Sequence, residues 1–168
     1  MAEVSLARST AYWAANFYSN PDKPPRPGAP LRDLPPIASQ RFRMLREALL
    51  EIDGASEKVR FILPNWKWSW EYSIPARKLC WLHVMETGVS GTFAISEDDE
   101  RQLDRLKPAG VVLTALRDGH RTGPVKWCSL EFSDRKSVDA FIGFMRKKAA
   151  WVAASPQDSR VFRPKTAG

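Results

Sequence analysis

The sequence predicts an α+β domain in which a mainly antiparallel sheet of about four to five strands carries helices on one face. Two long segments repeat apolar residues at helical spacing, and segments of strand length lie between them. The expected order is therefore helix, strands, helix, strand, helix. The chain has 168 residues, of which 43% are hydrophobic, which is enough for one compact core flanked by tails.

The first 36 residues are expected to lie outside this domain. Residues 1–20 contain a predicted amphipathic helix over 5–18, with Trp13 and Phe17 on its apolar stripe. Seven of the sixteen residues in 21–36 are proline, which favours an extended strap or linker. Such a strap would lay the helix over the sheet as a lid, or pass it to a second subunit as a swapped arm in a homodimer.

The domain itself is expected over residues 37–153 and begins with a helix. Ser39 is its candidate N-cap, an apolar stripe begins at Phe42, and Gly54 is a candidate stop. From residue 154 to 168 the sequence is polar, and we expect a flexible tail.

Residues 66–73, WKWSWEYS, alternate strictly between aromatic and polar side chains, which predicts a strand with one buried face. Residues 78–86 are apolar at both parities, which predicts a central strand covered on both sides. A third strand is expected over 91–95. The alternation of the first strand places four aromatic side chains on one face, namely Trp66, Trp68, Trp70 and Tyr72.

Ser96 is a candidate N-cap for an acid-opened helix over 97–106. Residues 111–117 fit a helix or a strand, and the sequence does not decide between them. A further strand is expected over 125–132, after which Ser133 is the candidate cap of a helix that reaches about residue 153. The buried stripe of that helix is predicted to be Val138, Phe141, Ile142, Met145 and Ala149.

Several of these short sequences together resemble a family of small bacterial proteins. They are the Trp-rich strand, KLCWL at 78–82, GTF at 91–93, Lys126-Trp127 and the Lys147-Lys148 pair. The family is domain of unknown function 3788, and the resemblance covers about residues 39–150. It implies an α+β fold and no established activity, so it assigns no catalytic residue.

The seven tryptophans are the strongest departure from ordinary composition. Aromatic rings gathered on adjacent strands can hold a planar, apolar or cationic ligand by stacking and by quadrupole attraction. We therefore expect a pocket for a small, largely apolar organic molecule. The alternative is that the rings only fill the core. The candidate ligand-binding residues are Trp66, Trp68, Trp70, Tyr72, Trp81 and Trp127.

The pocket would need a proton donor or acceptor if it also catalyses a reaction. Strand parity gives three candidates: His83 shares a face with Trp81, Glu131 shares one with Trp127, and Glu71 lies opposite the tryptophans unless a bulge turns it. The expected chemistry is then a cofactor-independent isomerisation, cyclisation or hydrolysis. Whether the protein catalyses or only binds stays open at this point.

No metal or cofactor is expected. The chain lacks a Gly-rich phosphate loop, a G-x-S-x-G elbow, an H-E-x-x-H motif and a dinucleotide fingerprint. Cys80 and His83 have the spacing of half a zinc site, but residues three apart on a strand point to opposite faces. Cys80 and Cys128 are instead expected to be buried thiols on neighbouring strands.

The net charge of +7 raises the possibility of a nucleic-acid partner. Only +4 of it belongs to residues 37–152, where the two signs are interspersed, so a binding module for nucleic acid or a protein partner is the alternative and not the leading hypothesis. No apolar stretch approaches the roughly 18 residues that cross a bilayer, and no secretory signal is recognisable, so we expect a cytoplasmic protein without membrane contact.

Overall fold

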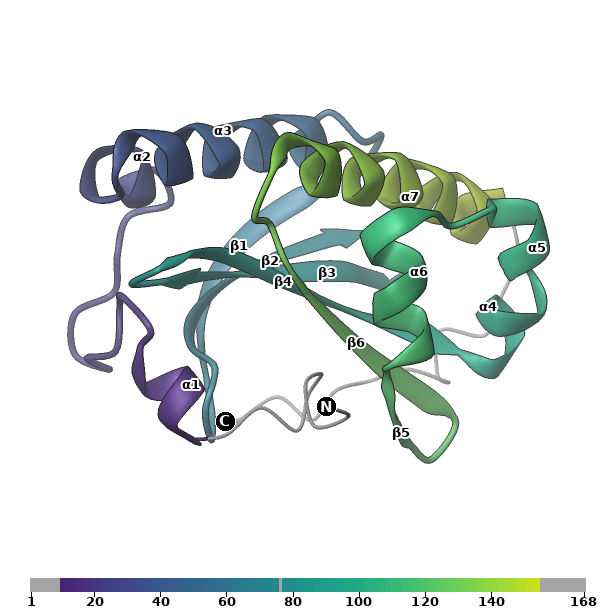
Figure 1. The fold of residues 1–168 in the computed structure, drawn as a ribbon, viewed down its shortest axis with the longest axis horizontal. Helices are drawn as coiled ribbons and strands as arrows, with labels where there is room; N and C mark the ends of the chain where they lie inside the picture. The colour runs from purple at the N-terminus through teal and green to yellow at the C-terminus, as the bar shows by residue number, and fades with distance from the viewer. Residues whose placement is uncertain (1–9, 76, 155–168) are drawn as a thin grey trace.

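A computed structural model describes residues 10–75 and 77–154. It has the predicted α+β class: an open antiparallel sheet with helices packed on one face (Figure 1). The strands are β1 (Ser56–Ile62), β2 (Lys67–Ile74), β3 (Arg77–Met85), β4 (Gly88–Ser96), β5 (His120–Thr122) and β6 (Val125–Glu131). The helices are α1 (Thr10–Ala14), α2 (Ala29–Asp33), α3 (Pro36–Leu50), α4 (Glu97–Arg101), α5 (Leu103–Leu106), α6 (Gly110–Arg117) and α7 (Arg135–Ala154).

The strand order is β1-β2-β3-β4-β6-β5, so the two strands that the sequence did not predict, β1 and β5, are the edges of the sheet. Neither edge strand has a strong pattern: β5 has three exposed residues, and β1 has one partly buried face. By contrast, β3 is central and buried over most of its length on both sides, as its apolar run predicted.

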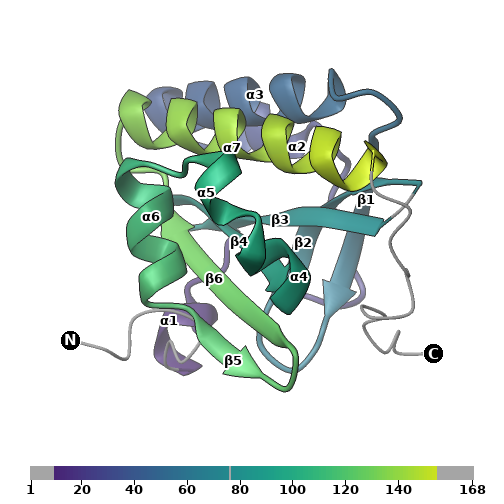
Figure 2. The ribbon, with the colours of Figure 1, turned by 90° about the vertical axis from the view of Figure 1, so that its right-hand side faces the viewer.

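The helices α3 and α7 lie side by side across one face of the sheet (Figure 2). Phe42 and Leu45 of α3 and Phe141 and Met145 of α7 are completely buried against the strands. The other members of the predicted α7 stripe, including Ile142, are buried as well. Residues 111–117, which the sequence left open, form α6 on the same side of the sheet, where the Lys126 ammonium donates to the Leu116 carbonyl.

Two predicted helix caps are wrong, and one is confirmed. Helix α3 begins at Pro36, because proline suits the first turn of a helix, and Ser39 lies inside it. Asp134, not Ser133, precedes α7 and accepts a hydrogen bond from the Ser137 amide at 2.8 Å. Ser96 does cap α4, where it forms a reciprocal capping box with Asp99.

Two further segments, residues 97–106 and residues 21–36, also differ from expectation. The acid-opened helix predicted over 97–106 is broken into α4 and α5. The proline-rich segment contains the short helix α2, so it is not extended throughout. It is attached to β2, because the Trp70 indole donates to the Pro27 carbonyl at 2.9 Å. The residue just before it, Asn20, is held in the same way, since its carbonyl accepts from the Trp68 indole at 2.7 Å.

The N-terminal segment joins the sheet at its far side from α3 and α7. Residues 15–17 run beside the end of β3, where the Phe17 amide donates to the Val84 carbonyl and the Glu86 amide donates to the Ala15 carbonyl. Within the described residues the predicted helix over 5–18 is reduced to α1. Its first part, like the predicted tail from 155 to 168, lies outside the described residues.

The two central strands of the sheet, β3 and β4, separate after the pair Trp81 and Thr92. β3 and β4 pair from Met85 and Gly88 up to Trp81 and Thr92, and from there β3 pairs only with β2 while β4 pairs only with β6. We call this division the fork. A narrow crevice at the fork is lined by Arg77, Lys78, Ala94, Ser96, Val125 and Lys148.

Candidate aromatic binding site

The four aromatic residues predicted to share one face of β2 lie on two faces. Trp70 and Tyr72 are completely buried on the side of α3, and the Trp70 ring packs edge-on against Phe42 with centroids 5.5 Å apart. Trp68 is half-buried and contacts Phe61 of β1. The Trp66 ring, by contrast, contacts the Trp81 ring. Trp81 pairs across the strands with Glu71, which lies between Trp70 and Tyr72 on β2, so Trp81 and Glu71 face away from α3.

The cause of this separation is a single backbone conformation. Lys67, between Trp66 and Trp68, has φ of 59°, in the left-handed region, so the alternation of the strand is interrupted at that residue. Trp66 belongs to the turn before β2, and the prediction that it shares a face with Trp70 is wrong.

Five rings meet on the sheet face opposite α3 and α7, which we call the second face. Trp66 is at the centre, with ring centroids 4.8 Å from His83, 5.5 Å from Trp81, 6.0 Å from Trp127 and 6.2 Å from Trp13. We call these five residues the aromatic cluster. Most of its ring pairs are edge-to-face, the arrangement that the quadrupoles of aromatic rings favour.

Four separate segments contribute to the aromatic cluster. Trp81 and His83 alternate on β3, Trp127 comes from β6, Trp66 from the turn before β2 and Trp13 from α1. The side-chain Nδ2 of Asn16, two residues after α1, donates to the Trp66 carbonyl at 2.8 Å, which ties this segment to that turn. Sequence reasoning placed Trp13 on an amphipathic helix that a strap could lay over the sheet, but it did not assign Trp13 to the site.

Exposure differs within the aromatic cluster. Trp13 and Trp81 are each 2% exposed and His83 is completely buried, whereas Trp66 and Trp127 remain partly exposed. The two partly exposed indoles therefore form the solvent-facing surface of the cluster.

His83 belongs to a chain of hydroxyl groups beneath the rings. Its Nδ1 lies 3.0 Å from Ser69 Oγ, and its Nε2 lies 2.9 Å from Thr92 Oγ1. Thr92 in turn lies 3.4 Å from Ser129 Oγ. Both ring nitrogens are thus engaged, and the imidazole is held in place as a buried structural group.

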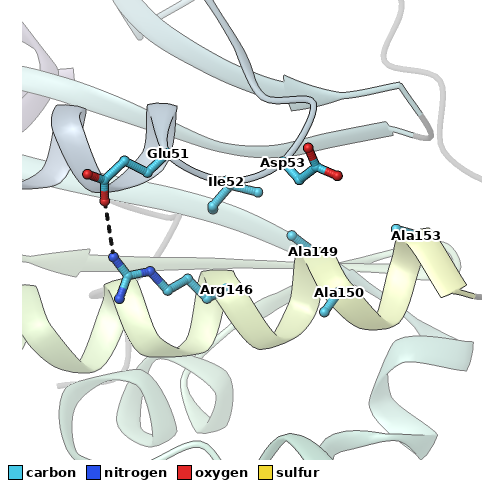
Figure 3. Close-up of a pocket in the computed structure, with 7 residues that line it drawn as sticks. All are labelled: Glu51, Ile52, Asp53, Arg146, Ala149, Ala150 and Ala153. Atoms are coloured by element: carbon cyan, nitrogen blue, oxygen red, sulfur yellow. Dashed lines mark ion pairs between the residues drawn. The ribbon is translucent and has the colours of Figure 1, made fainter.

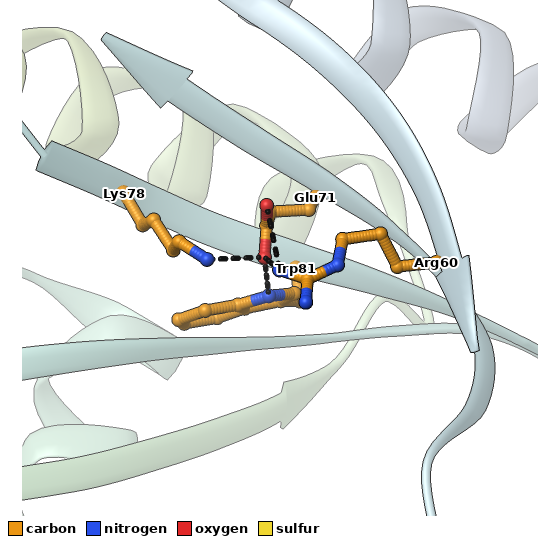
Figure 4. A network of polar contacts seen from close by, with 4 residues as sticks. All are labelled: Arg60, Glu71, Lys78 and Trp81. Carbon is orange, nitrogen blue, oxygen red and sulfur yellow. Dashed lines mark hydrogen bonds and ion pairs between the residues drawn. The ribbon is translucent and has the colours of Figure 1, made fainter. Parts of the chain in front are cut away.

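Glu71 faces the aromatic cluster, on the side away from Trp70 and Tyr72. Its Oε2 accepts hydrogen bonds from the Trp81 indole at 3.0 Å, the Lys78 ammonium at 3.1 Å and Arg60 at 3.0 Å, as Figure 4 shows. Arg60 also reaches Oε1 at 3.3 Å. Arg60 and Lys78 are the polar residues that sequence reasoning missed. Arg60 lies on β1, which was not predicted, and Lys78 lies on β3 beyond the register shift between Tyr72 and Ser73, which no sequence pattern indicated.

Glu131, the third acid-base candidate, lies away from the aromatic cluster. It shares the parity of Trp127, as predicted, but it is four residues along β6, roughly 13 Å by strand geometry, and exposed. It lines a different cleft of about 380 Å³, together with Arg41 of α3 and Met85 of β3. The structure therefore brings together two of the three candidates, His83 and Glu71.

Another hollow, of about 390 Å³, lies between the end of α3 and α7 (Figure 3). Its floor is formed by alanines of α7, including Ala149 and Ala153, and by Ile52. Glu51 and Arg146 form an ion pair of 3.6 Å across it. The hollow contains none of the residues predicted to bind a ligand.

The two cysteines lie in the core beneath the helices. Burial raises the pKa of the Cys80 thiol, and it raises the pKa of Cys128 to about 12, so both stay protonated. They are buried and free, as predicted, but they are not on neighbouring strands, since β4 lies between β3 and β6. Cys80 and His83 point to opposite faces, and no group of three or more potential metal ligands occurs in the described part of the chain.

Comparison with protein families, with curated proteins and with solved structures finds no match for this chain. Among the helices of the described residues, none combines the length and the apolar character that crossing a bilayer requires.

Proposed function

We propose that this protein binds a small, planar, largely apolar molecule on the second face of the sheet, against Trp66 and Trp127. The observation that carries the proposal is the aromatic cluster itself: four indoles from four separate segments meet on the face opposite the main helix layer, and two of them stay partly exposed. Indole faces in such a position offer a large area for stacking at little cost in side-chain entropy.

The arrangement favours binding over acid-base catalysis. Glu71 accepts hydrogen bonds from two cations and an indole, and His83 has a hydroxyl group at each ring nitrogen. Both groups are buried and already engaged by these partners, so neither is positioned to exchange a proton with a ligand on the exposed indoles. A catalytic role for Glu131 would need a substrate in the cleft beside Arg41 instead.

Titration of the protein with 2-naphthamide, a neutral planar molecule, followed by ligand-observed NMR, tests the proposal. We expect saturable binding that Trp66→Ala and Trp127→Ala each weaken about fivefold, because each removes a stacking surface. Trp68→Ala is the matched control: it removes a half-buried indole from β2 outside the aromatic cluster and leaves the affinity unchanged. No saturable binding, or binding that all three variants retain equally, would overturn the proposal.

A second candidate function, binding of single-stranded nucleic acid, is favoured by one observation. Arg60 and Lys78 lie next to the aromatic cluster, and stacking surfaces beside cations are the usual means of holding a single strand. A mixed oligonucleotide would then bind with an affinity that falls steeply with salt, in proportion to the number of phosphates contacted. Salt-insensitive binding of 2-naphthamide, with no oligonucleotide binding, favours the first candidate.

A further inference from the structure

The charged residues of the second face are gathered at one border of the aromatic cluster. Trp81 connects the two, since its ring packs against Trp66 and Trp127 while its indole nitrogen donates to Glu71. Arg60 and Lys78 bind the same carboxylate from either side, as Figure 4 shows. A ligand stacked on the exposed indoles would therefore lie beside this border.

The border carries more positive than negative charge. Glu71 contributes one negative charge and is shared by Arg60 and Lys78. Lys58 adds a third cation, because it is the direct cross-strand partner of Glu71 and so faces the same way, and it is exposed. On the strands of this face the next carboxylate in the described residues is Glu131, at the far end of β6.

The excess positive charge favours anionic planar ligands over cationic and neutral ones. The stacking surface attracts any planar ring, but a cationic ligand would meet Lys58 and the guanidinium of Arg60. The excess positive charge would attract an anionic group instead, and Arg60 offers donors in the planar arrangement that suits a carboxylate. A neutral ligand would gain only the stacking.

Resting on the proposed function, we infer that the ligand of this site is a planar aromatic acid, with its ring on Trp66 and Trp127 and its carboxylate toward Arg60 and Lys58. The sequence predicted an apolar or cationic ligand, because that prediction considered only the tryptophans. The charged residues beside the aromatic cluster favour an anionic ligand instead.

Three naphthalene derivatives of nearly equal shape test the inference on the intact protein: 2-naphthoate, 2-naphthamide and 2-naphthylmethylamine. We expect the acid to bind about tenfold more tightly than the amide, the value of a charge-assisted hydrogen bond, and the amine to bind more weakly than both. Arg60→Gln and Lys58→Gln should each reduce the affinity for the acid severalfold and leave that for the amide unchanged.

Arg43→Gln is the matched control, because Arg43 is exposed on α3, on the opposite side of the sheet. The Lys58→Gln variant is expected to fold normally, because Lys58 is exposed and the structure gives it no hydrogen bond or ion pair to another described residue. A change in its affinity therefore reports on the ligand and not on misfolding. Equal affinities for acid and amide, both weakened in Trp66→Ala, would overturn the acid preference and leave the proposed function standing. Absence of binding by all three compounds would overturn the proposed function and the inference with it.

Discussion

The buried side chain of Lys148 is expected to lower the stability of the fold. It is 1% exposed on α7 and reaches the crevice at the fork, where Arg77 forms a 2.7 Å ion pair with Asp99. In the described residues the Lys148 ammonium has no hydrogen bond or ion pair of its own. Burial lowers the pKa of Lys148 to about 8, although the nearby Asp99 carboxylate partly offsets this effect.

The pH dependence follows from the direction of this shift. Since the pKa is lower in the folded chain than in the unfolded one, the cost of burying the ammonium is complete below pH 8 and disappears as the pH rises toward 10.5. We expect Lys148→Met to raise the free energy of unfolding at pH 7 by about 1–3 kcal/mol, and by much less at pH 10. Urea denaturation at both pH values measures the difference.

Lys147→Met is the control for this prediction. It removes the same charge from the neighbouring exposed position, so its effect should stay within about 0.5 kcal/mol. A loss of stability in Lys148→Met at pH 7 would mean that the ammonium makes a net favourable contact in the crevice.

Lys67 is a second residue whose effect on stability can be predicted. Its left-handed backbone, at φ 59°, disfavours any residue with a Cβ atom, whereas glycine adopts it freely. We expect Lys67→Gly to raise the free energy of unfolding by about 0.5 kcal/mol, and Lys58→Gly, within β1, to lower it by a similar amount. Thermal unfolding of the two variants checks this, and equal destabilisation by both would refute the strain at Lys67.

At the scale of the element, the serine predicted as the cap of α7 can be distinguished from the residue that caps this helix. Asp134 satisfies the first turn of α7, so Asp134→Ala should cost about 1 kcal/mol, the usual value of a lost N-cap. Ser133→Ala should cost almost nothing. Chemical denaturation measures both variants, and the reverse order would show that the cap was wrongly assigned.

The elements that the sequence predicted well are those with strong local patterns. The stripe of α7, the apolar run of β3 and the acidic start of α4 at Ser96 each depend on residues close together in the chain. The edge strands β1 and β5 were missed because an edge needs only one partner and little burial. The aromatic cluster was only partly predicted, since one left-handed residue at Lys67 moved Trp66 to the other face.

At the scale of the whole molecule, the sheet separates two groups of aromatic residues. Trp70 packs beneath α3, whereas Trp66 packs with Trp81 on the second face. Substitutions at Trp66 and Trp70 should therefore add, with a coupling below about 0.5 kcal/mol, while those at Trp66 and Trp81 should couple by about 0.5–1.5 kcal/mol.

Double-mutant cycles with phenylalanine at each position measure both couplings by chemical denaturation. Phenylalanine keeps most of the apolar volume, so the variants are expected to fold. A strong coupling between Trp66 and Trp70 would place both rings on one face after all and contradict the arrangement described above.

The two edges of the sheet bear on whether another copy of this protein can pair with its strands. An exposed edge offers unpaired amide and carbonyl groups on which another chain can add a strand, the first step of aggregation. Here one edge, β5, is only three residues long, and the other, β1, carries Lys58 and Arg60 on one face. Neither edge is a long, flat, apolar template, so the charge that borders the aromatic cluster also discourages edge-to-edge pairing with another copy.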